Sequence, residues 1–274
     1  MDLLRKITDK DILKCALPVC IVIFFTMLII YSSLLATEQK KRNELIKQEQ
    51  LRKDAEMKVY LMGKFDPSTR EDFVVVPEKY SLYNNGKMYL RKETLNAYLK
   101  MQEAAQREGV QIKISSATRN FEYQREFWNG KWSTNTEIDA IEKNTENFNR
   151  FKKILEYVSV PGTSRHHWGT EIDINGANLA YFNSIKGIRE YQWLAKNAGT
   201  FGFCQTYRNK DIDKRTGYNE ERWHWSYTPL SKTFTEEYRR LVTKEDIYGF
   251  IGDKYVLEQD LVNQYALSIN PECL

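Results

Sequence analysis

One stretch near the middle of the chain combines a strand pattern with two histidines and reads Ser164-Arg165-His166-His167-Trp168-Gly169-Thr170-Glu171-Ile172-Asp173-Ile174-Asn175. In an extended strand, successive side chains point to opposite faces. Ile172 and Ile174 therefore lie on one face, and Asp173 lies on the other. Gly169 lets the backbone turn from the histidine loop into this strand. The segment thus predicts a strand with an apolar face and an acidic face.

A second segment, Trp223-His224-Trp225-Ser226-Tyr227, alternates in the same way. Its aromatic residues share one face, and His224 lies on the other face with Ser226. We predict an α+β fold in which these strands belong to an antiparallel sheet with helices packed on the apolar face. Both candidate ligands then lie on the open face, where a zinc cleft is expected.

Helical spacing or strand alternation indicates several further elements. Apolar residues at helical spacing predict a helix over 92–108, and Gly109 ends it. Alternation over 110–115 predicts a half-buried strand. Further helices are expected at 121–128, 138–158 and 187–198, with two or three more after the second motif strand.

The three histidines of the chain all lie in or beside the two motif strands. Histidine is the commonest transition-metal ligand in proteins. Catalytic zinc typically takes three nitrogen or oxygen ligands and keeps one position for water. His166, Asp173 and His224 supply that set. A zinc ion so held lowers the pKa of water to about 7.

A carboxylate near the metal is needed to take a proton from water and pass it to the leaving amine. Glu221, three residues before His224, is the best-placed candidate. Glu171 shares a strand face with Asp173, could approach the metal, and ranks second. His167 cannot easily face the same metal as its neighbour, so we expect it to support the site or to face substrate.

The spacing Ser-x-His-x-x-Gly-x-x-x-Asp followed by Glu-x-Trp-His resembles the D-alanyl-D-alanine carboxypeptidase family of zinc peptidases. That family includes the vancomycin-resistance carboxypeptidases and dipeptidases and shares its core with the hedgehog signalling domain. A third segment, Ser116-Ala117-Thr118-Arg119-Asn120-Phe121-Glu122-Tyr123-Gln124, resembles the family's Ser-Gly-Tyr-Arg-Ser-x-x-x-Gln. The resemblance covers roughly residues 70–230.

The resemblance implies roles for the residues of these motifs. His166, Asp173 and His224 would bind zinc, and Glu221 would be the general base. Arg119 would stabilise the developing oxyanion or hold a substrate carboxylate, because a guanidinium suits either task. The remaining motif positions, Gln124 and Ser164, would contact the substrate or support the site.

The sequence also departs from the family pattern at three positions. Thr118, Glu171 and Arg222 stand where many members have tyrosine, alanine and proline. The metal ligands and the base are intact, so the departures do not argue against activity. They leave open which substrate is cleaved.

An uncharged segment from Cys15 to Ala36 spans 22 positions. As a helix it would be about 33 Å long, enough to cross a bilayer core. We expect an uncleaved membrane anchor; a cleaved signal peptide and a buried helix are the alternatives. Positive charges flank both ends, so the charge rule does not settle the orientation.

The charge balance argues against nucleic acid as a partner. The chain carries 41 basic and 37 acidic residues, a net charge of +4, without a strong basic block. Cys204 and Cys273 are the only cysteine pair outside the apolar segment. A disulfide between them is possible if this part of the chain is exported, and the sequence does not decide whether it forms.

These features predict an ordered layout along the chain. A tail covers residues 1–14, the anchor 15–36, a helical stalk 37–69, the peptidase domain 70–230 and a helical extension 231–274.

The resemblance implies a zinc carboxypeptidase that is anchored in the bacterial cytoplasmic membrane. It would remove the terminal D-alanine from peptidoglycan stem peptides, with the catalytic domain outside the cytoplasm. Two alternatives remain. The enzyme could be an L,D-carboxypeptidase or an endopeptidase acting on the same polymer. The chain could also be a non-catalytic peptidoglycan-binding protein that keeps zinc for structural reasons.

Overall fold

A computed structural model describes residues 9–83, 86–134 and 145–274 of the chain. The chain divides into two compact units, Met1–Ala55 and Glu56–Leu274. The start of the predicted N-terminal tail, up to residue 8, lies outside the described residues. The same holds for the first part of the helix predicted over 138–158, up to residue 144.

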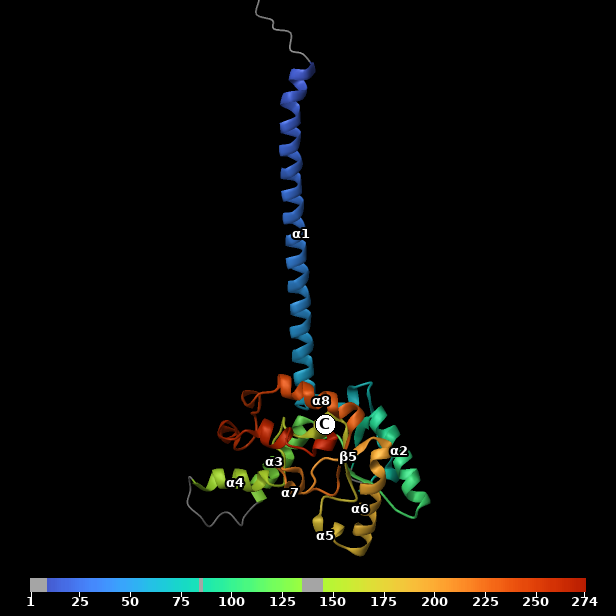
Figure 1. The fold of residues 1–274 in the computed structure, drawn as a ribbon. Helices are drawn as coiled ribbons and strands as arrows, with labels where there is room; N and C mark the ends of the chain where they lie inside the picture. Colours follow the sequence, from blue (N-terminus) through green and yellow to red (C-terminus); the bar gives the residue numbers. More distant parts are fainter. Residues whose placement is uncertain (1–8, 84–85, 135–144) are drawn as a thin grey trace, which may run out of the picture. The chain divides into compact units, whose positions relative to one another are not determined.

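The described part of the first unit is helix α1 (Asp9–Leu61), drawn in blue in Figure 1, up to Ala55; the last residues of this helix belong to the second unit. Its part from Ile21 onward contains an 18-residue window of mean hydropathy 2.0. The apolar side chains between Ile21 and Leu35 are exposed. By length and composition this helix is a candidate membrane span, as the uncharged segment predicted. A signal sequence passes the same test.

The second unit begins at Glu56, within the region predicted as a stalk. It contains the helices α2 (Lys92–Arg107), α3 (Phe121–Thr134), α4 (Thr145–Leu155), α5 (Leu179–Phe182), α6 (Ile185–Asn197), α7 (Lys210–Asp213) and α8 (Thr228–Leu241). Its strands are β1 (Phe73–Val75), β2 (Tyr89–Arg91), β3 (Ile114–Ser116), β4 (Glu171–Ile174), β5 (Phe203–Gln205) and β6 (His224–Tyr227). Short helical turns are η1 (Pro67–Thr69), η2 (Glu78–Tyr80), η4 (Arg165–Trp168), η5 (Ala198–Phe201), η6 (Lys244–Asp246), η7 (Asp253–Glu258), η8 (Val262–Ala266) and η9 (Pro271–Cys273).

Four strands form one antiparallel sheet in the order β3-β4-β6-β5, and β1 pairs with β2 in a small second sheet. The predicted antiparallel sheet is therefore confirmed, with both motif strands at its centre. The outer strand β5 was not predicted, because three residues are too few to show an alternation. It completes the edge of the sheet next to β6.

Strand β3 is shorter than the strand predicted over 110–115, and the side chain of Asn175 gives the reason. Its Oδ1 accepts a hydrogen bond from the Lys113 amide at 2.8 Å, and its Nδ2 donates to the Gln111 carbonyl at 2.9 Å. The side chain of Asn175 thus takes up the Lys113 amide and the Gln111 carbonyl, while the Lys113 carbonyl accepts from the Asn175 backbone amide at 2.8 Å. Regular pairing begins only at Ile114, which lies opposite Ile174.

The apolar face of the main sheet is covered by helices α2 and α6, which Figure 1 labels on the same side of this unit. The core here joins buried helical side chains with the motif isoleucines and Trp225. Its buried members include Leu95, Tyr98, Met101, Ile172, Ile174, Trp193, Leu194 and Trp225. The opposite face carries the polar motif residues. The mixed helix-and-sheet fold with helices on one face is as predicted.

A second core lies around α3, α4, α8 and the C-terminal turns, and it includes the end of α1. Trp168 of η4 is fully buried there, and its Nε1 donates to the Leu61 carbonyl at 3.0 Å. The Tyr60 hydroxyl donates to the Trp168 carbonyl at 2.5 Å. These bonds fix the turn η4, which carries the first motif histidines.

Candidate metal centre and cleft

The register of β4 and β6 brings two predicted ligands together. Asp173 pairs directly with His224, and Ile172 pairs with Trp225 on the opposite face. Side chains of directly opposed residues lie about 4.5–5.5 Å apart at Cβ. Here Nδ1 of His224 and Oδ1 of Asp173 are 3.6 Å apart.

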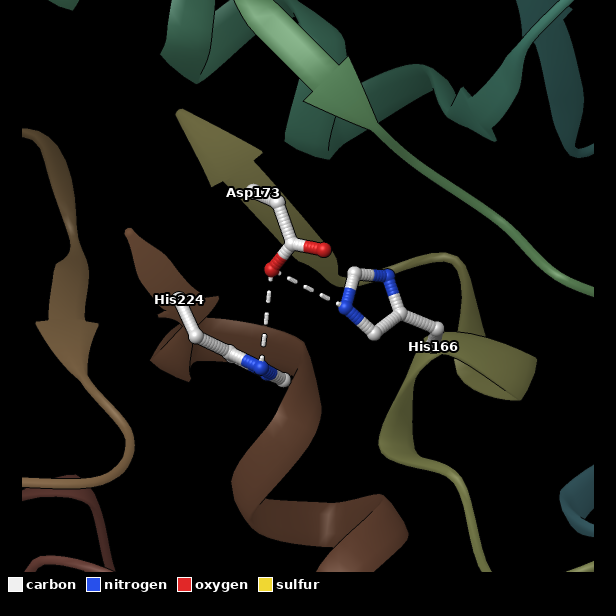
Figure 2. A group of neighbouring side chains, drawn as sticks. All are labelled: His166, Asp173 and His224. Atoms are coloured by element: carbon white, nitrogen blue, oxygen red, sulfur yellow. Dashed lines mark ion pairs between the residues drawn. The ribbon is translucent and has the colours of Figure 1, made fainter. Parts of the chain in front are cut away.

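His166 reaches the same carboxylate from the turn η4. Gly169 follows η4 with a φ of 73°, and a Cβ at this position would lie 2.5 Å from the Phe73 ring. Only glycine fits both this positive φ and the close contact with Phe73, in agreement with the predicted turn at Gly169. The Nδ1 of His166 is 2.7 Å from the Ala117 carbonyl, and its Nε2 is 3.3 Å from Oδ1 of Asp173. Figure 2 shows both imidazoles aimed at this oxygen.

The donor set fits a metal ion. One ligand atom from each of His166, Asp173 and His224 lies within 4.8 Å of the others, and all three residues are buried. Among the described residues, Nε2 of His166 and Oδ1 of Asp173 have no hydrogen-bond partner. Buried polar atoms without a partner are rare and call for a ligand or an ion. Tetrahedral zinc would space its nitrogen and oxygen ligands roughly 3.4 Å apart, close to the 3.3 and 3.6 Å that separate Oδ1 of Asp173 from the nitrogens of His166 and His224.

The charge states of these residues also suit a cation. Burial lowers the pKa of His166, with the charge of Arg119 adding to the effect. The ring is therefore neutral, and its Nδ1–H donates to the Ala117 carbonyl, which leaves the Nε2 lone pair for a metal. Burial alone would raise the pKa of Asp173, but the positive charges nearby, those of His224 and Arg119 among them, outweigh it and hold the pKa well below its ordinary value.

Glu221 lies next to this cluster. Its Oε2 is 3.0 Å from Nδ1 of His224, and its side chain is 13% exposed. It lines a cleft of about 710 Å³, whose wall also includes Asp173, His224 and Arg119. The Nε of Arg119 is buried and has no hydrogen-bond partner among the described residues. A carboxylate and a guanidinium thus lie in one cleft with the ligand cluster.

The other two predicted site residues lie deeper. Gln124 is fully buried and donates from Nε2 to the Ser159 carbonyl at 2.7 Å, so it contacts a residue of the cleft wall. Ser164 caps η4 and is 2% exposed. Its hydroxyl has no hydrogen-bond partner within the described ranges. Neither side chain is part of the cleft lining.

His167 bridges two backbone segments. Its Nε2 accepts from the Gly162 amide at 3.0 Å, and its Nδ1 donates to the Arg119 carbonyl at 2.5 Å. Burial lowers its pKa to about 3, so the ring stays neutral. Gly63 packs so closely that a Cβ there would lie 2.4 Å from Nδ1 of this ring. His167 therefore supports the loop that carries Arg119.

From the sequence, Glu171 ranked second as a base because it shares a strand face with Asp173, but the contacts of this residue were not predicted. Glu171 lies behind His224 with its Oε2 3.0 Å from Nε2 of that ring, and it is paired with the buried Arg165 at 3.4 Å. Nothing in the sequence marked Arg165 or Tyr207. Tyr207 packs edge-on against His224, with the ring centroids 4.9 Å apart, and lines the cleft.

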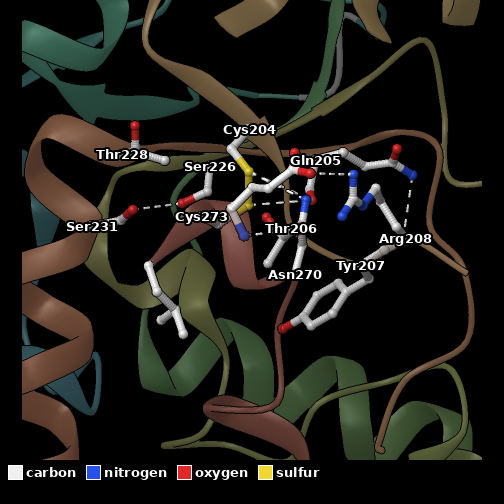
Figure 3. The surroundings of a disulfide bond; sticks show 12 residues. Cys204, Gln205, Thr206, Tyr207, Arg208, Ser226, Thr228, Ser231, Asn270 and Cys273 are labelled. Atoms are coloured by element: carbon white, nitrogen blue, oxygen red, sulfur yellow. Dashed lines mark hydrogen bonds and ion pairs between the residues drawn. A yellow bond between two sulfur atoms is a disulfide. The ribbon is translucent and has the colours of Figure 1, made fainter. Parts of the chain in front are cut away.

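The C-terminal segment is tied to the sheet by a disulfide between Cys204 of β5 and Cys273, shown in Figure 3. The sequence left this bridge open. Next to it, Asn270 donates from Nδ2 to the Gln205 carbonyl at 3.0 Å and from its backbone amide to the Thr206 carbonyl at 2.9 Å. The bridge and these bonds hold the C-terminal residues against the strand next to β6.

Comparison with known proteins agrees with this geometry. Residues 87–230 match the model of the VanY D-alanyl-D-alanine carboxypeptidase family. The chain is 28% identical over 170 residues to the putative carboxypeptidase YodJ of Bacillus subtilis, covering 61% of this chain and 56% of that protein. It is 30% identical over 131 residues to a D-alanyl-D-alanine carboxypeptidase of Enterococcus faecalis, covering 47% and 44%.

Among solved structures, the LdcB LD-carboxypeptidase is similar with a TM-score of 0.46 and 24% identity, over 66% of this chain and 81% of that one. The chain spans about half the length of the curated relatives that it matches. The family match covers more than half of this chain and includes all three motif segments. The chain therefore belongs to the VanY D-alanyl-D-alanine carboxypeptidase family.

Proposed function

We propose that this chain is a zinc carboxypeptidase that hydrolyses the terminal D-Ala-D-Ala amide of peptidoglycan stem peptides. One observation carries the proposal. His166, Asp173 and His224 converge beside a cleft of about 710 Å³ that Asp173 and His224 line, and Glu221 lies 3.0 Å from the metal-facing nitrogen of His224. A purely structural metal site needs neither the cleft nor the carboxylate.

Each residue has a distinct role in this proposal. Zinc held by the three ligands would lower the pKa of water and polarise the scissile carbonyl. Glu221 accepts the proton of the attacking water and delivers it to the leaving amine. Arg119 faces the same cleft and holds the substrate carboxylate or the developing oxyanion. Gln124 holds the cleft wall through its bond to the Ser159 carbonyl, and Ser164 lies at the start of the turn that carries His166, beside the substrate.

The proposed location is the bacterial cytoplasmic membrane, with the catalytic unit outside the cytoplasm. Helix α1 supplies the anchor over residues 15–36, and the part of the predicted stalk before Glu56, where the compact second unit begins, links it to the catalytic unit. The peptidase domain covers 70–230, and 231–274 form an extension packed on it. The Cys204–Cys273 disulfide supports an oxidising compartment. Peptidoglycan, the proposed partner, lies on the same side.

The test uses the full chain, purified in detergent and loaded with zinc. It is incubated with three substrates: pentapeptide stems ending in D-Ala-D-Ala, tetrapeptide stems in which the terminal D-alanine follows an L-amino acid, and cross-linked dimers of stem peptides. Mass spectrometry then identifies the products. Release of one D-alanine from the pentapeptide, with no product from the other two substrates, supports the proposal. Cleavage of the tetrapeptide or the cross-link instead would replace it with L,D-carboxypeptidase or endopeptidase activity, and no product with any of them would favour a binding protein.

A Glu221→Gln variant provides the matched control. It keeps the size of the side chain but removes the carboxylate that takes the proton. We expect turnover to fall by about 10²–10⁴ because general base catalysis is lost. Zinc content, measured by atomic emission, stays at one ion per chain. Full turnover in this variant would show that another group is the base.

A further inference from the structure

Glu171 lies on the far side of His224 from the metal cluster. His224 presents Nδ1 toward Asp173 at 3.6 Å, whereas its Nε2 faces Oε2 of Glu171 at 3.0 Å. Glu171 is fully buried and does not line the cleft. The carboxylate therefore contacts the imidazole without access to substrate or to the position between the three ligands.

Both oxygens of Glu171 are occupied by donors. Its Oε2 accepts from His224 and from the Thr206 hydroxyl at 3.2 Å. Its Oε1 accepts from the Ser226 hydroxyl at 2.7 Å and from the Thr170 hydroxyl at 3.3 Å. A carboxylate surrounded in this way can only accept, so Nε2 of His224 must carry the hydrogen.

The buried guanidinium of Arg165 keeps this carboxylate in place. Its Nε lies 3.4 Å from Oε1 of Glu171, and both side chains are 0% exposed. Arg165 is itself fixed by a bond to the Thr235 hydroxyl at 2.9 Å, and it stacks over the Trp168 ring at 4.3 Å. The pair is thus anchored to helix α8 and to the turn that carries His166.

We propose that Glu171, held by Arg165, is the positioning residue that commits His224 to binding the metal through Nδ1. The nitrogen that binds a metal is set by the hydrogen bond that the other nitrogen makes. This inference rests on the metal site of the proposed function and adds a residue outside its ligand set. His166 is held in the opposite sense, with Nδ1 on the Ala117 carbonyl and Nε2 toward the metal position.

A purely structural ion pair is the competing interpretation, and two double variants separate it from a positioning role. Removing Glu171 alone would leave Arg165 buried and unpaired, which is strongly destabilising. Both variants therefore carry Arg165→Met, combined either with Glu171→Leu or with Glu171→Gln. Replacing a buried ion pair by apolar residues is often neutral for stability. The two variants differ only in whether position 171 can still accept a bond from His224.

The first measurement is the zinc affinity of the full chain in detergent, by competition with a fluorescent chelator from the zinc-free state. We expect the Arg165→Met/Glu171→Leu variant to bind zinc about 10–100-fold more weakly than the natural chain. The variant with Glu171→Gln should lie between the two. Wild-type affinity in the Glu171→Leu variant would overturn the inference, since the pair would then be structural only.

A matched control comes from Glu190, another buried carboxylate. It is 3% exposed and accepts from Asn175 at 2.7 Å and from Tyr181 at 2.5 Å. Glu190→Gln should leave zinc affinity unchanged. An equal loss in this variant would contradict a specific role for Glu171.

The second measurement identifies the metal-binding nitrogens directly. The chain has only three histidines, so ring-¹⁵N labelling gives three imidazoles to assign. In the zinc-loaded natural chain, His224 should carry hydrogen at Nε2 and His166 at Nδ1. Hydrogen at Nδ1 of His224 would overturn the inference while leaving the metal site intact. If His166→Ala bound zinc as tightly as the natural chain, the proposed function and this inference would fail together.

Discussion

His166 and His167 are neighbours in the sequence, both buried, yet they lie in different surroundings. In each, Nδ1 faces a backbone carbonyl, that of Ala117 at 2.7 Å and that of Arg119 at 2.5 Å. The second nitrogen differs. Nε2 of His167 accepts from the Gly162 amide, whereas Nε2 of His166 has no hydrogen-bond partner in the described part of the chain and faces Asp173.

This difference shows what separates a metal ligand from a supporting histidine. Both rings are held by one carbonyl, so orientation alone does not decide the role. The role depends on whether the remaining lone pair is already used by the protein. In His167 it is used, and the ring links the loop at 162 to the loop at 119. In His166 it stays available for a cation.

The largest expected effect is on His166. His166→Ala removes a ligand, and the loss of zinc affinity should exceed the 10–100-fold typical of supporting residues, reaching at least about 1,000-fold. Peptidase turnover should fall with zinc occupancy. Chelator competition on the full chain measures the affinity. Zinc binding that is unchanged within a factor of three would remove His166 from the ligand set.

His167→Ala tests the other side of the comparison. The variant loses two buried hydrogen bonds and leaves a cavity beside Gly63, which we expect to cost about 3 kcal/mol of unfolding free energy. Zinc affinity of the folded protein should change little. Denaturant titration of the zinc-free chain, with zinc competition in parallel, separates the two quantities. A loss of zinc affinity as large as that of His166→Ala would make His167 a ligand.

A smaller effect concerns pH. Burial alone would lower the pKa of His224, but bonds to Glu171 and Glu221 outweigh it and raise the pKa to about 9 without metal. Zinc must then displace a proton from Nδ1, so zinc affinity should rise about tenfold per pH unit between about pH 7 and 9. In the zinc-free chain, the stabilisation from charged His224 is present below its unfolded pKa of about 6.5 and lost as pH rises through 9. Isothermal titration at several pH values checks this, and a flat profile would contradict it.

The residue pattern was sufficient to predict the faces of the two central strands. Alternation placed Asp173 and His224 opposite their apolar neighbours, and the observed register confirms that they share a face. The register itself was not predictable, because alternation fixes a face but not the partner of each residue. The assigned roles of Glu221, Arg119, Gln124 and Ser164 stay predictions, now with a location for each.

Other features depended on distant contacts that a single sequence does not reveal. Cys204 and Cys273 are separated by 69 positions, and only the fold brings them together. The short strand β5 and the truncated β3 follow from pairing partners and from the Asn175 side chain. The Arg165–Glu171 pair belongs to the same class, since its members are six positions apart but meet behind a residue of another strand.

The most direct test of the account is the position of the metal. Anomalous diffraction at the zinc edge, on crystals of the zinc-loaded chain, should give a single peak about 2.0–2.2 Å from Nε2 of His166, Oδ1 of Asp173 and Nδ1 of His224. A peak bound by other residues, or none within reach of these three atoms, would contradict it.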